Sequence, residues 1–207
     1  KVHVLYNGVN RKITHFPEKK KEILFVGRLV SEKGVDLYVE VVKSIAHNYP
    51  DWNFGIIGSL KLGDQNKTNF FGNKVIEKFK SIGSQARYYG FKDYSFVEDK
   101  MKTASIIVIP SLWQEPFGLV AAEAMSHGIC IIASKVGGIP EIIRDNGVLI
   151  KNINFQKIKK NLIELINDEE LRNFYQKRAW EDFKFSAESS SKKLDKFREI
   201  ILSQNSY

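Results

Sequence analysis

Two cations stand in a short turn near the start of the chain, directly after an apolar run that predicts a strand. The run is EILFVG (22–27), and the turn carries Arg28 and Lys33 before Gly34 opens a segment with helical spacing. Arginine can bind phosphate oxygens through two parallel hydrogen bonds, and lysine supplies a compact positive charge. The two residues suit a diphosphate, although the turn alone also fits a surface loop whose arginine pairs with a carboxylate.

A second turn carries a carboxylate and leads into an apolar helix, in the segment PSLWQEPFGLVAAEAMSHG (110–128). Its loop presents Glu115 before the helix begins. The first amides of a helix have no acceptor within it and lie at the positive end of its dipole, where a phosphate can bind. We therefore expect the amides of Gly118, Leu119 and Val120 to hold a phosphate, with Gly118 allowing an oxygen to approach closely.

The same helix contains a single formal charge, Glu123, and is expected to start around Phe117 and Gly118 and to end at Gly128. An ionised carboxylate among apolar neighbours is costly unless it is hydrogen-bonded. Hydroxyl groups of a ligand would donate such bonds, whereas the alternative is a salt bridge on an exposed edge of the helix.

Two more expected strands end at the same rim of the sheet. Gly58 closes NFGIIG (53–58), and Phe91 follows ARYYG (86–90). Open α/β sheets bind ligands at the carboxyl ends of their strands, so both positions, together with Gly27, are candidates for a binding site. Each alone is weak evidence, because glycine after a strand is common in turns, and their joint occurrence carries more weight.

The sequence argues against several other kinds of site. Neither a Gly-x-Gly-x-x-Gly fingerprint nor a Walker motif follows the first expected strand, which disfavours a dinucleotide dehydrogenase and a P-loop nucleotidase. The four histidines are scattered without metal-binding spacing, and the sequence has no Asp-x-Asp pair. We therefore expect neither a metal ion nor another cofactor.

The elements that must position these residues alternate along the first 150 residues. Short apolar runs, several of them apolar on consecutive residues, are separated by segments of helical spacing, as is typical of parallel strands covered by helices on both faces. We expect an α/β fold with a Rossmann-like, doubly wound parallel sheet of about six strands. The expected strands span 22–27, 53–58, 86–90, 105–110, 129–134 and 148–150.

The remaining residues predict a helical C-terminal tail. An apolar stripe formed by Leu194, Phe197 and Ile201 must cover either this domain or a neighbour. The expected helices of the tail span 154–167, 168–184 and 186–204.

The composition identifies no partner. Lys and Arg number 32 against 24 Asp and Glu in 207 residues, and this excess is diffuse, as is typical of solvated faces. The only cysteine, Cys130, lies in an apolar run without a disulfide partner, which fits a reducing cytoplasm. We find no apolar stretch near 18 residues and no signal peptide at the given N-terminus.

Three motifs together resemble the donor-binding C-terminal domain of family-4 retaining GT-B glycosyltransferases, the glycosyl transferases of group 1. They are VGRLVSEKG, EPFGLVAAE with seven residues between its glutamates, and VGGIPEII. The resemblance implies one half of a GT-B fold. Residues 1–18 would be a hinge and the end of an N-terminal domain outside this sequence, residues 19–185 the donor-binding domain, and residues 186–207 a helix that returns to the other domain.

The resemblance also implies residue roles. Arg28 and Lys33 would neutralise the leaving diphosphate and, with Glu115 facing the donor sugar, would be the catalytic residues. Glu123 would hydrogen-bond the ribose, and the backbone at Phe91 would contact the base. The full set implied for donor binding is Gly27, Arg28, Lys33, Gly58, Phe91, Glu115, Phe117, Gly118, Leu119, Val120 and Glu123.

The function implied is transfer of a hexose from a nucleotide-diphosphate sugar to a saccharide or lipid-linked acceptor, in bacterial polysaccharide or lipopolysaccharide synthesis. The acceptor would be bound through the other domain, and the full-length protein would act in the cytoplasm or at the inner face of the cell membrane. A GT-B sugar phosphorylase remains an alternative, and a basic nucleic-acid-binding module is a remote one. The base, the sugar, the acceptor and the oligomeric state stay open.

Overall fold

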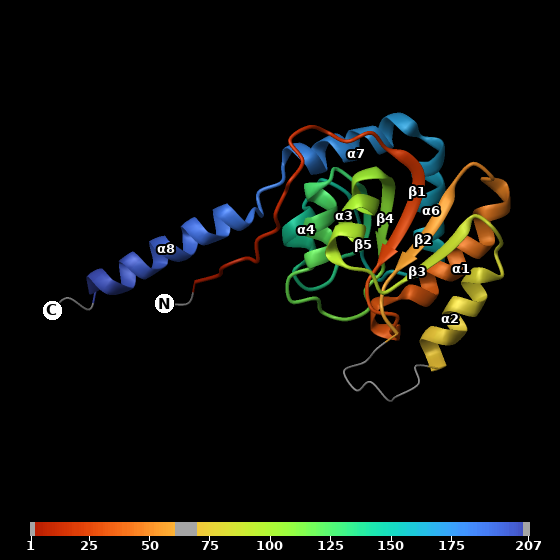
Figure 1. The fold of residues 1–207 in the computed structure, drawn as a ribbon, viewed down its shortest axis with the longest axis horizontal. Coiled ribbons are helices and arrows are strands. Elements are labelled where there is room, and N and C mark those ends of the chain that lie inside the picture. The colour runs from red at the N-terminus through yellow and green to blue at the C-terminus, as the bar shows by residue number, and fades with distance from the viewer. Residues whose placement is uncertain (1–2, 61–69, 205–207) are drawn as a thin grey trace.

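The protein, described here from a computed structural model over residues 3–60 and 70–204, is built on a six-stranded sheet in the order β3-β2-β1-β4-β5-β6 (Figure 1). All neighbouring strands pair in parallel. The expected doubly wound α/β sheet is confirmed, and each of the six apolar runs forms a strand. The strands are β1 Lys20–Val26, β2 Asn53–Ile57, β3 Ala86–Gly90, β4 Ala104–Ile109, β5 Cys130–Ser134 and β6 Val148–Ile150.

The winding reverses between β1 and β4. The chain runs outward from β1 through β2 to β3, then returns to the other side of β1 and runs outward again from β4 to β6. Ligands of open α/β sheets bind at the carboxyl ends of the strands where the order reverses. The turns that follow β1 and β4 are therefore the expected place for a site.

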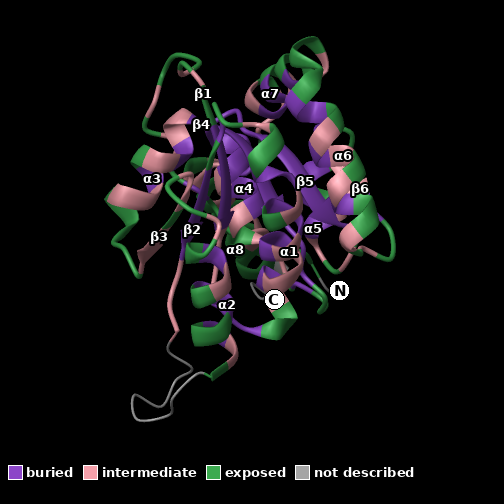
Figure 2. Ribbon diagram, turned by 90° about the vertical axis from the view of Figure 1, so that its right-hand side faces the viewer, coloured by how far each residue is buried: buried purple, intermediate pink, exposed green. Residues whose placement is uncertain are grey.

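Helices cover both faces of the sheet (Figure 1). One apolar cluster joins the sheet to α1, α2 and α6, and a second joins it to α3, α4, α5 and α7. Every residue of β4 and β5 is buried, which explains their unbroken apolar runs (Figure 2). The helices are α1 Val35–Ile45, α2 Phe70–Lys80, α3 Tyr94–Thr103, α4 Leu119–Ser126, α5 Ile139–Ile143, α6 Phe155–Asn167, α7 Glu169–Glu181 and α8 Ala187–Gln204.

The helical tail is confirmed, with one boundary wrong. Asp168 caps α7 by accepting a hydrogen bond from the Leu171 amide, but the helix ends at Glu181 and not at residue 184. The chain leaves the helix because Phe183 packs against the second apolar cluster and the carbonyl of Phe185 accepts a hydrogen bond from Val9.

The last helix, α8, extends away from the sheet domain (Figure 1). Leu194 is 36% exposed and Ile201 is 57% exposed, while Phe197 meets His3 with ring centroids 4.7 Å apart. The apolar stripe therefore does not cover this domain. Of the two partners expected from the sequence, this leaves a neighbouring domain.

The N-terminal segment, residues 3–18, runs along the second face and is anchored by Arg11. Its guanidinium donates hydrogen bonds to the carbonyls of Ser126 and Trp180, at 3.0 and 2.6 Å, and lies 3.9 Å from the Trp180 ring centroid. These contacts join the segment to the C-terminal ends of α4 and α7.

Cys130 lies fully buried at the start of β5, and burial raises the pKa of its thiol. It therefore packs as a small apolar side chain, as its sequence context predicted. Over the described residues, no helix is both long enough and apolar enough to cross a membrane.

Candidate active site

The turns after β1 and β4 pack against each other at the reversal point of the sheet. The Leu112 amide donates a 2.8 Å hydrogen bond to the Glu32 carbonyl. Gly34 has φ +65°, and a Cβ there would lie 2.1 Å from the Pro110 carbonyl oxygen. Only glycine permits this approach, which brings the end of the first turn onto the second.

This packing places Lys33 beside Glu115. The Lys33 Nζ lies 2.5 Å from Glu115 Oε1, and the Ser111 hydroxyl donates to the same oxygen at 2.6 Å. Lys33 Nζ also lies 5.2 Å from the centroid of the Trp113 ring. Sequence reasoning identified the two charges but missed Ser111 and Trp113, because nothing in their spacing marks them.

The Glu115 carboxylate is ionised although it is only 8% exposed. Burial raises its pKa, but hydrogen bonds from Lys33, Ser111 and Trp113 outweigh burial, so the pKa lies below its usual value. The structure thus holds a formal positive and a formal negative charge in contact at the ends of β1 and β4.

A pair of glycines fixes the loop that carries Glu115. The Gly138 amide donates a 2.7 Å hydrogen bond to the Glu115 carbonyl, and the Gly137 amide donates to Gln114 Oε1 at 2.7 Å. Gly137 has φ +53°, and a Cβ there would lie 2.1 Å from the Glu115 carbonyl oxygen. The glycines of the VGGIPEII segment therefore serve to hold this loop, a role that sequence reasoning did not assign.

A cavity of about 120 Å³ opens next to the Lys33–Glu115 pair. It is enclosed by the two turns and by the start of α4. Its lining combines this ion pair with backbone and apolar groups: Phe25, Val26, Gly27, Lys33, Ile109, Ser111, Glu115, Gly118, Leu119, Val120, Ala121 and Ile139.

The N-terminal end of α4 faces this cavity. Gly118, with φ +97°, precedes the helix, and the amides of Ala121 and Ala122 bond to its carbonyl. In the described part of the chain, no residue accepts a hydrogen bond from the amides of Gly118, Leu119 or Val120. These are the free donors that the sequence predicted, and they lie on the cavity that Lys33 and Glu115 also line.

The cavity lining does not include four other predicted positions, Arg28, Phe91, Gly58 and Phe117. Arg28 is exposed in the first turn, and Phe91 is 79% exposed after β3. Gly58 has a structural reason to be glycine, because a Cβ there would lie 1.8 Å from the Gly27 carbonyl oxygen. Phe117, between Glu115 and α4, packs against the second apolar cluster.

Glu123 is half-buried on α4, and no described residue donates a hydrogen bond to its carboxylate. Burial raises its pKa to about 7. The alternative interpretation of Glu123, a salt bridge on an exposed edge of the helix, is therefore wrong.

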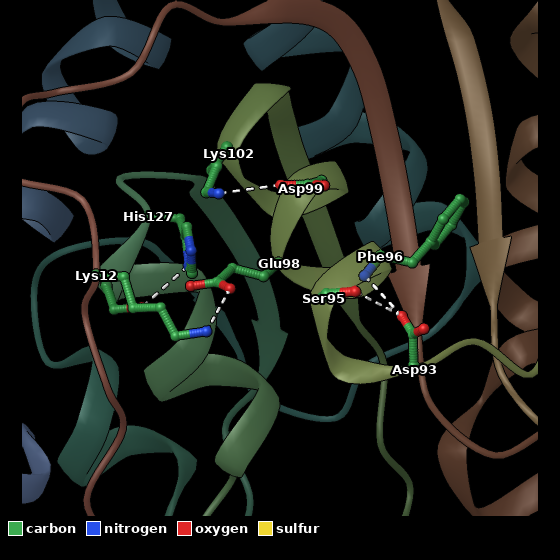
Figure 3. A network of polar contacts seen from close by, with 9 residues as sticks. Lys12, Asp93, Ser95, Phe96, Glu98, Asp99, Lys102 and His127 are labelled. Atoms are coloured by element: carbon green, nitrogen blue, oxygen red, sulfur yellow. Dashed lines mark hydrogen bonds and ion pairs between the residues drawn. The ribbon is translucent and has the colours of Figure 1, made fainter.

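Figure 3 shows two buried polar side chains that sequence reasoning missed, Glu98 and His127. Glu98 is 5% exposed and accepts a 2.9 Å hydrogen bond from Lys12 Nζ, while His127 is 1% exposed, with Nδ1 2.9 Å from the Glu123 carbonyl oxygen. The Glu98 and His127 side chains point toward one another in Figure 3. Burial lowers the pKa of His127, which favours a neutral imidazole at the C-terminal end of α4.

Among the described residues, no three His, Cys, Asp or Glu side chains gather in a way that would hold a metal ion. The cavity lining combines one cationic side chain, Lys33, with the Glu115 carboxylate and the amides at the start of α4.

Comparison with known proteins identifies the family of this chain. The family model for glycosyl transferases group 1 matches residues 8–182. An uncharacterized glycosyltransferase of Methanocaldococcus jannaschii, MJ1178, is 37% identical over 190 residues, which cover 86% of this chain and 50% of that protein. The chain thus spans about half the length of this curated relative.

Two solved structures share the fold. The C-terminal domain of LpcC, a glycosyl transferase group 1 family protein from Francisella tularensis, is 29% identical with a TM-score of 0.65, covering 86% of this chain and 93% of that one. Anabaena HepE, solved in complex with UDP-glucose, is 18% identical with a TM-score of 0.75, covering 87% of this chain and 49% of that one, and supports the fold alone. The chain belongs to the glycosyl transferases group 1 family and has the fold of a GT-B C-terminal domain.

Proposed function

We propose that this chain is the donor-binding half of a retaining hexosyltransferase that uses a nucleotide-diphosphate sugar. The observation that carries the proposal is the cavity shared by Lys33, Glu115 and the free amides at the start of α4. A cation and a helix N-terminus facing one small cavity suit a diphosphate, because both offer positive charge to its oxygens. The UDP-glucose bound in HepE is consistent with such a donor.

In this proposal the bond between the anomeric carbon and the diphosphate oxygen breaks while the acceptor oxygen bonds to that carbon. Lys33, Arg28 and the amides of residues 118–120 stabilise the charge that develops on the leaving diphosphate. The acceptor hydroxyl passes its proton to a leaving phosphate oxygen on the same face of the sugar, which retains the anomeric configuration. Glu115 faces the sugar, and Glu123 accepts hydrogen bonds from ribose hydroxyls.

The acceptor belongs to the part of the protein that this chain does not contain. Because the chain covers 50% of the length of MJ1178, we assign the binding of a saccharide or lipid-linked acceptor to the remaining half. We place the reaction in bacterial polysaccharide or lipopolysaccharide synthesis, as the family resemblance implies. This chain alone would then bind donor without appreciable transfer, since rate enhancement depends on holding both reactants in attack geometry.

A thermal-shift series with UDP, GDP and ADP and with their sugar conjugates tests the proposal. A ligand that binds only the folded chain raises its melting temperature, by an amount that grows with concentration over Kd. We expect one base to give a clear shift and Lys33→Ala to reduce it. The absence of a shift with every nucleotide would overturn the proposal, and release of a sugar 1-phosphate in phosphate buffer by the longer protein would point to a phosphorylase.

A further inference from the structure

Three aromatic rings from distant parts of the chain meet beside the loop that carries Glu115. Tyr6 comes from the N-terminal segment, Phe117 from the loop itself, and Phe185 from the residues that precede α8. The ring centroids of Tyr6 and Phe185 lie 5.5 Å apart, those of Phe117 and Phe185 5.8 Å, and those of Tyr6 and Phe117 6.1 Å. We call these three residues the aromatic cluster.

Backbone contacts fix two members of the aromatic cluster relative to each other. The Val9 amide donates a 2.8 Å hydrogen bond to the Phe185 carbonyl, and the Ala187 amide donates to the Val9 carbonyl at 3.2 Å. A Cβ at Gly8 would lie 2.3 Å from the Ala187 Cα, so the two segments lie in close contact. Tyr6 and Phe185 are thus held on one framework, separate from the donor loop.

Tyr6 also contacts α5, which directly follows the glycine pair that is hydrogen-bonded to the Glu115 loop. Its hydroxyl donates a short hydrogen bond to Glu141 Oε2 on α5. Glu141 lies three residues after Gly138, whose amide bonds to the Glu115 carbonyl. Tyr6 therefore contacts both Phe117 and α5, the two structures that flank Glu115.

Phe117 is the residue through which this framework reaches the cavity. It precedes Gly118, which has φ +97° and turns the chain into α4. A glycine in this conformation does not define the chain direction by itself, because it has little steric restriction. The ring of Phe117, packed against the rings of Tyr6 and Phe185, supplies the missing restraint.

We infer that Tyr6 and Phe185 are positioning residues for the donor loop, holding Phe117 so that Glu115 and the free amides of residues 118–120 face the cavity. Neither residue lines the cavity, so both act through Phe117. The N-terminal segment and the residues before α8 thereby set the geometry of the site. This inference rests on the proposed function for the identity of the ligand, but the coupling between the segments does not depend on it.

Amide hydrogen exchange in the unliganded chain tests the coupling directly. We expect Tyr6→Ala to speed exchange at least fivefold at Gly138, Ala121 and Ala122, whose amides bond to the loop. His3→Ala is the matched control, because His3 lies in the same segment and stacks on α8 at Phe197 without contacting Phe117. Phe185→Leu, which keeps an apolar side chain, should give the same pattern as Tyr6→Ala.

Nucleotide titration provides the second readout. Tyr6→Ala should weaken binding of UDP at least fivefold more than binding of uridine, because only the diphosphate uses the amides of residues 118–120. Tyr6→Phe should restore most of the loss, since it keeps the ring and removes only the hydroxyl.

The two readouts separate the failure of this inference from that of the proposed function. If UDP binds the wild-type chain but Tyr6→Ala and His3→Ala have equal effects on exchange and affinity, the positioning role is wrong. If the wild-type chain binds no nucleoside diphosphate while Tyr6→Ala alone loosens the loop, the proposed function fails and the coupling stands.

Discussion

Lys33 Nζ lies 2.5 Å from Glu115 Oε1 across 82 positions of sequence, and this ion pair lines the cavity at the start of α4. The lysine is 20% exposed and the glutamate 10% exposed at the side chain, so water screens the pair only in part. A bound diphosphate must share the lysine with the carboxylate. The first two predictions follow from this competition.

Replacing Lys33 or Arg28 by alanine should weaken binding of the nucleoside diphosphate by about 1–3 kcal/mol, the usual worth of a charge-assisted hydrogen bond. Binding of the nucleoside should change much less. Isothermal calorimetry measures both, with Lys43→Ala as a control on the exposed side of α1. If both variants bind the diphosphate like wild type, the phosphate assignment is wrong.

Glu115→Gln should strengthen binding of a sugar-free diphosphate about two- to tenfold, because Lys33 loses the negative partner with which a phosphate competes. In the longer protein, Glu115→Ala should lower kcat more than donor affinity if the carboxylate acts on the transition state. Glu32→Gln, an exposed neighbour of Lys33, controls for net charge. Weaker diphosphate binding by Glu115→Gln would contradict this reading of the pair.

The Glu123 carboxyl should make stability fall as pH rises. Its pKa of about 7 lies above the ordinary value of 4.5, so between these two pH values the folded chain holds a proton that the unfolded chain has lost. The stabilisation is complete below about pH 4.5 and is lost as pH passes 7, amounting to roughly 1–3 kcal/mol. Urea unfolding at pH 5 and pH 8 should therefore show Glu123→Gln gaining stability over wild type at the higher pH. An equal difference at both pH values would mean that Glu123 titrates normally.

Nucleotide binding should survive EDTA. The candidate site offers a lysine and helix amides to a diphosphate, and the described residues contain no cluster of three metal-ligating side chains. Titrations with and without chelator should agree within a factor of two. A tenfold loss of affinity, about 1.4 kcal/mol, would require a divalent ion in the site.

Gly34→Ala should destabilise the chain more than Gly90→Ala does. Both glycines have left-handed backbone, with φ of +65° and +75°, so an added Cβ lowers the free energy of unfolding by about 1–2 kcal/mol at each position. At Gly34 the Cβ also meets the Pro110 carbonyl, whereas nothing lies within 4 Å of it at Gly90. Denaturant melts should show an additional loss of roughly 1–3 kcal/mol for Gly34→Ala. Equal losses would mean that the two turns do not depend on this contact.

Much of the fold follows from local patterns in the sequence. The strands at 22–27 and 105–110 could be predicted because consecutive apolar residues have one stable place, the inside of a sheet covered on both faces. The strand order, which the structure supplies, then puts the turns after these two strands side by side. The free amides that follow Gly118 could also be predicted, because the first amides of any α-helix have no acceptor within the helix.

The sequence by itself therefore determined the class of fold, and it predicted the edge of the sheet for the candidate site and the charged residues at that edge. Only the tertiary structure decided that Lys33 pairs with Glu115, that Gly138 holds the loop, and that Tyr6 reaches Phe117. It also left Arg28 exposed and outside the cavity lining. The reason is physical: periodicity and backbone preference act over a few residues, whereas contacts between residues far apart in the chain depend on how whole elements pack and which rotamers that packing permits.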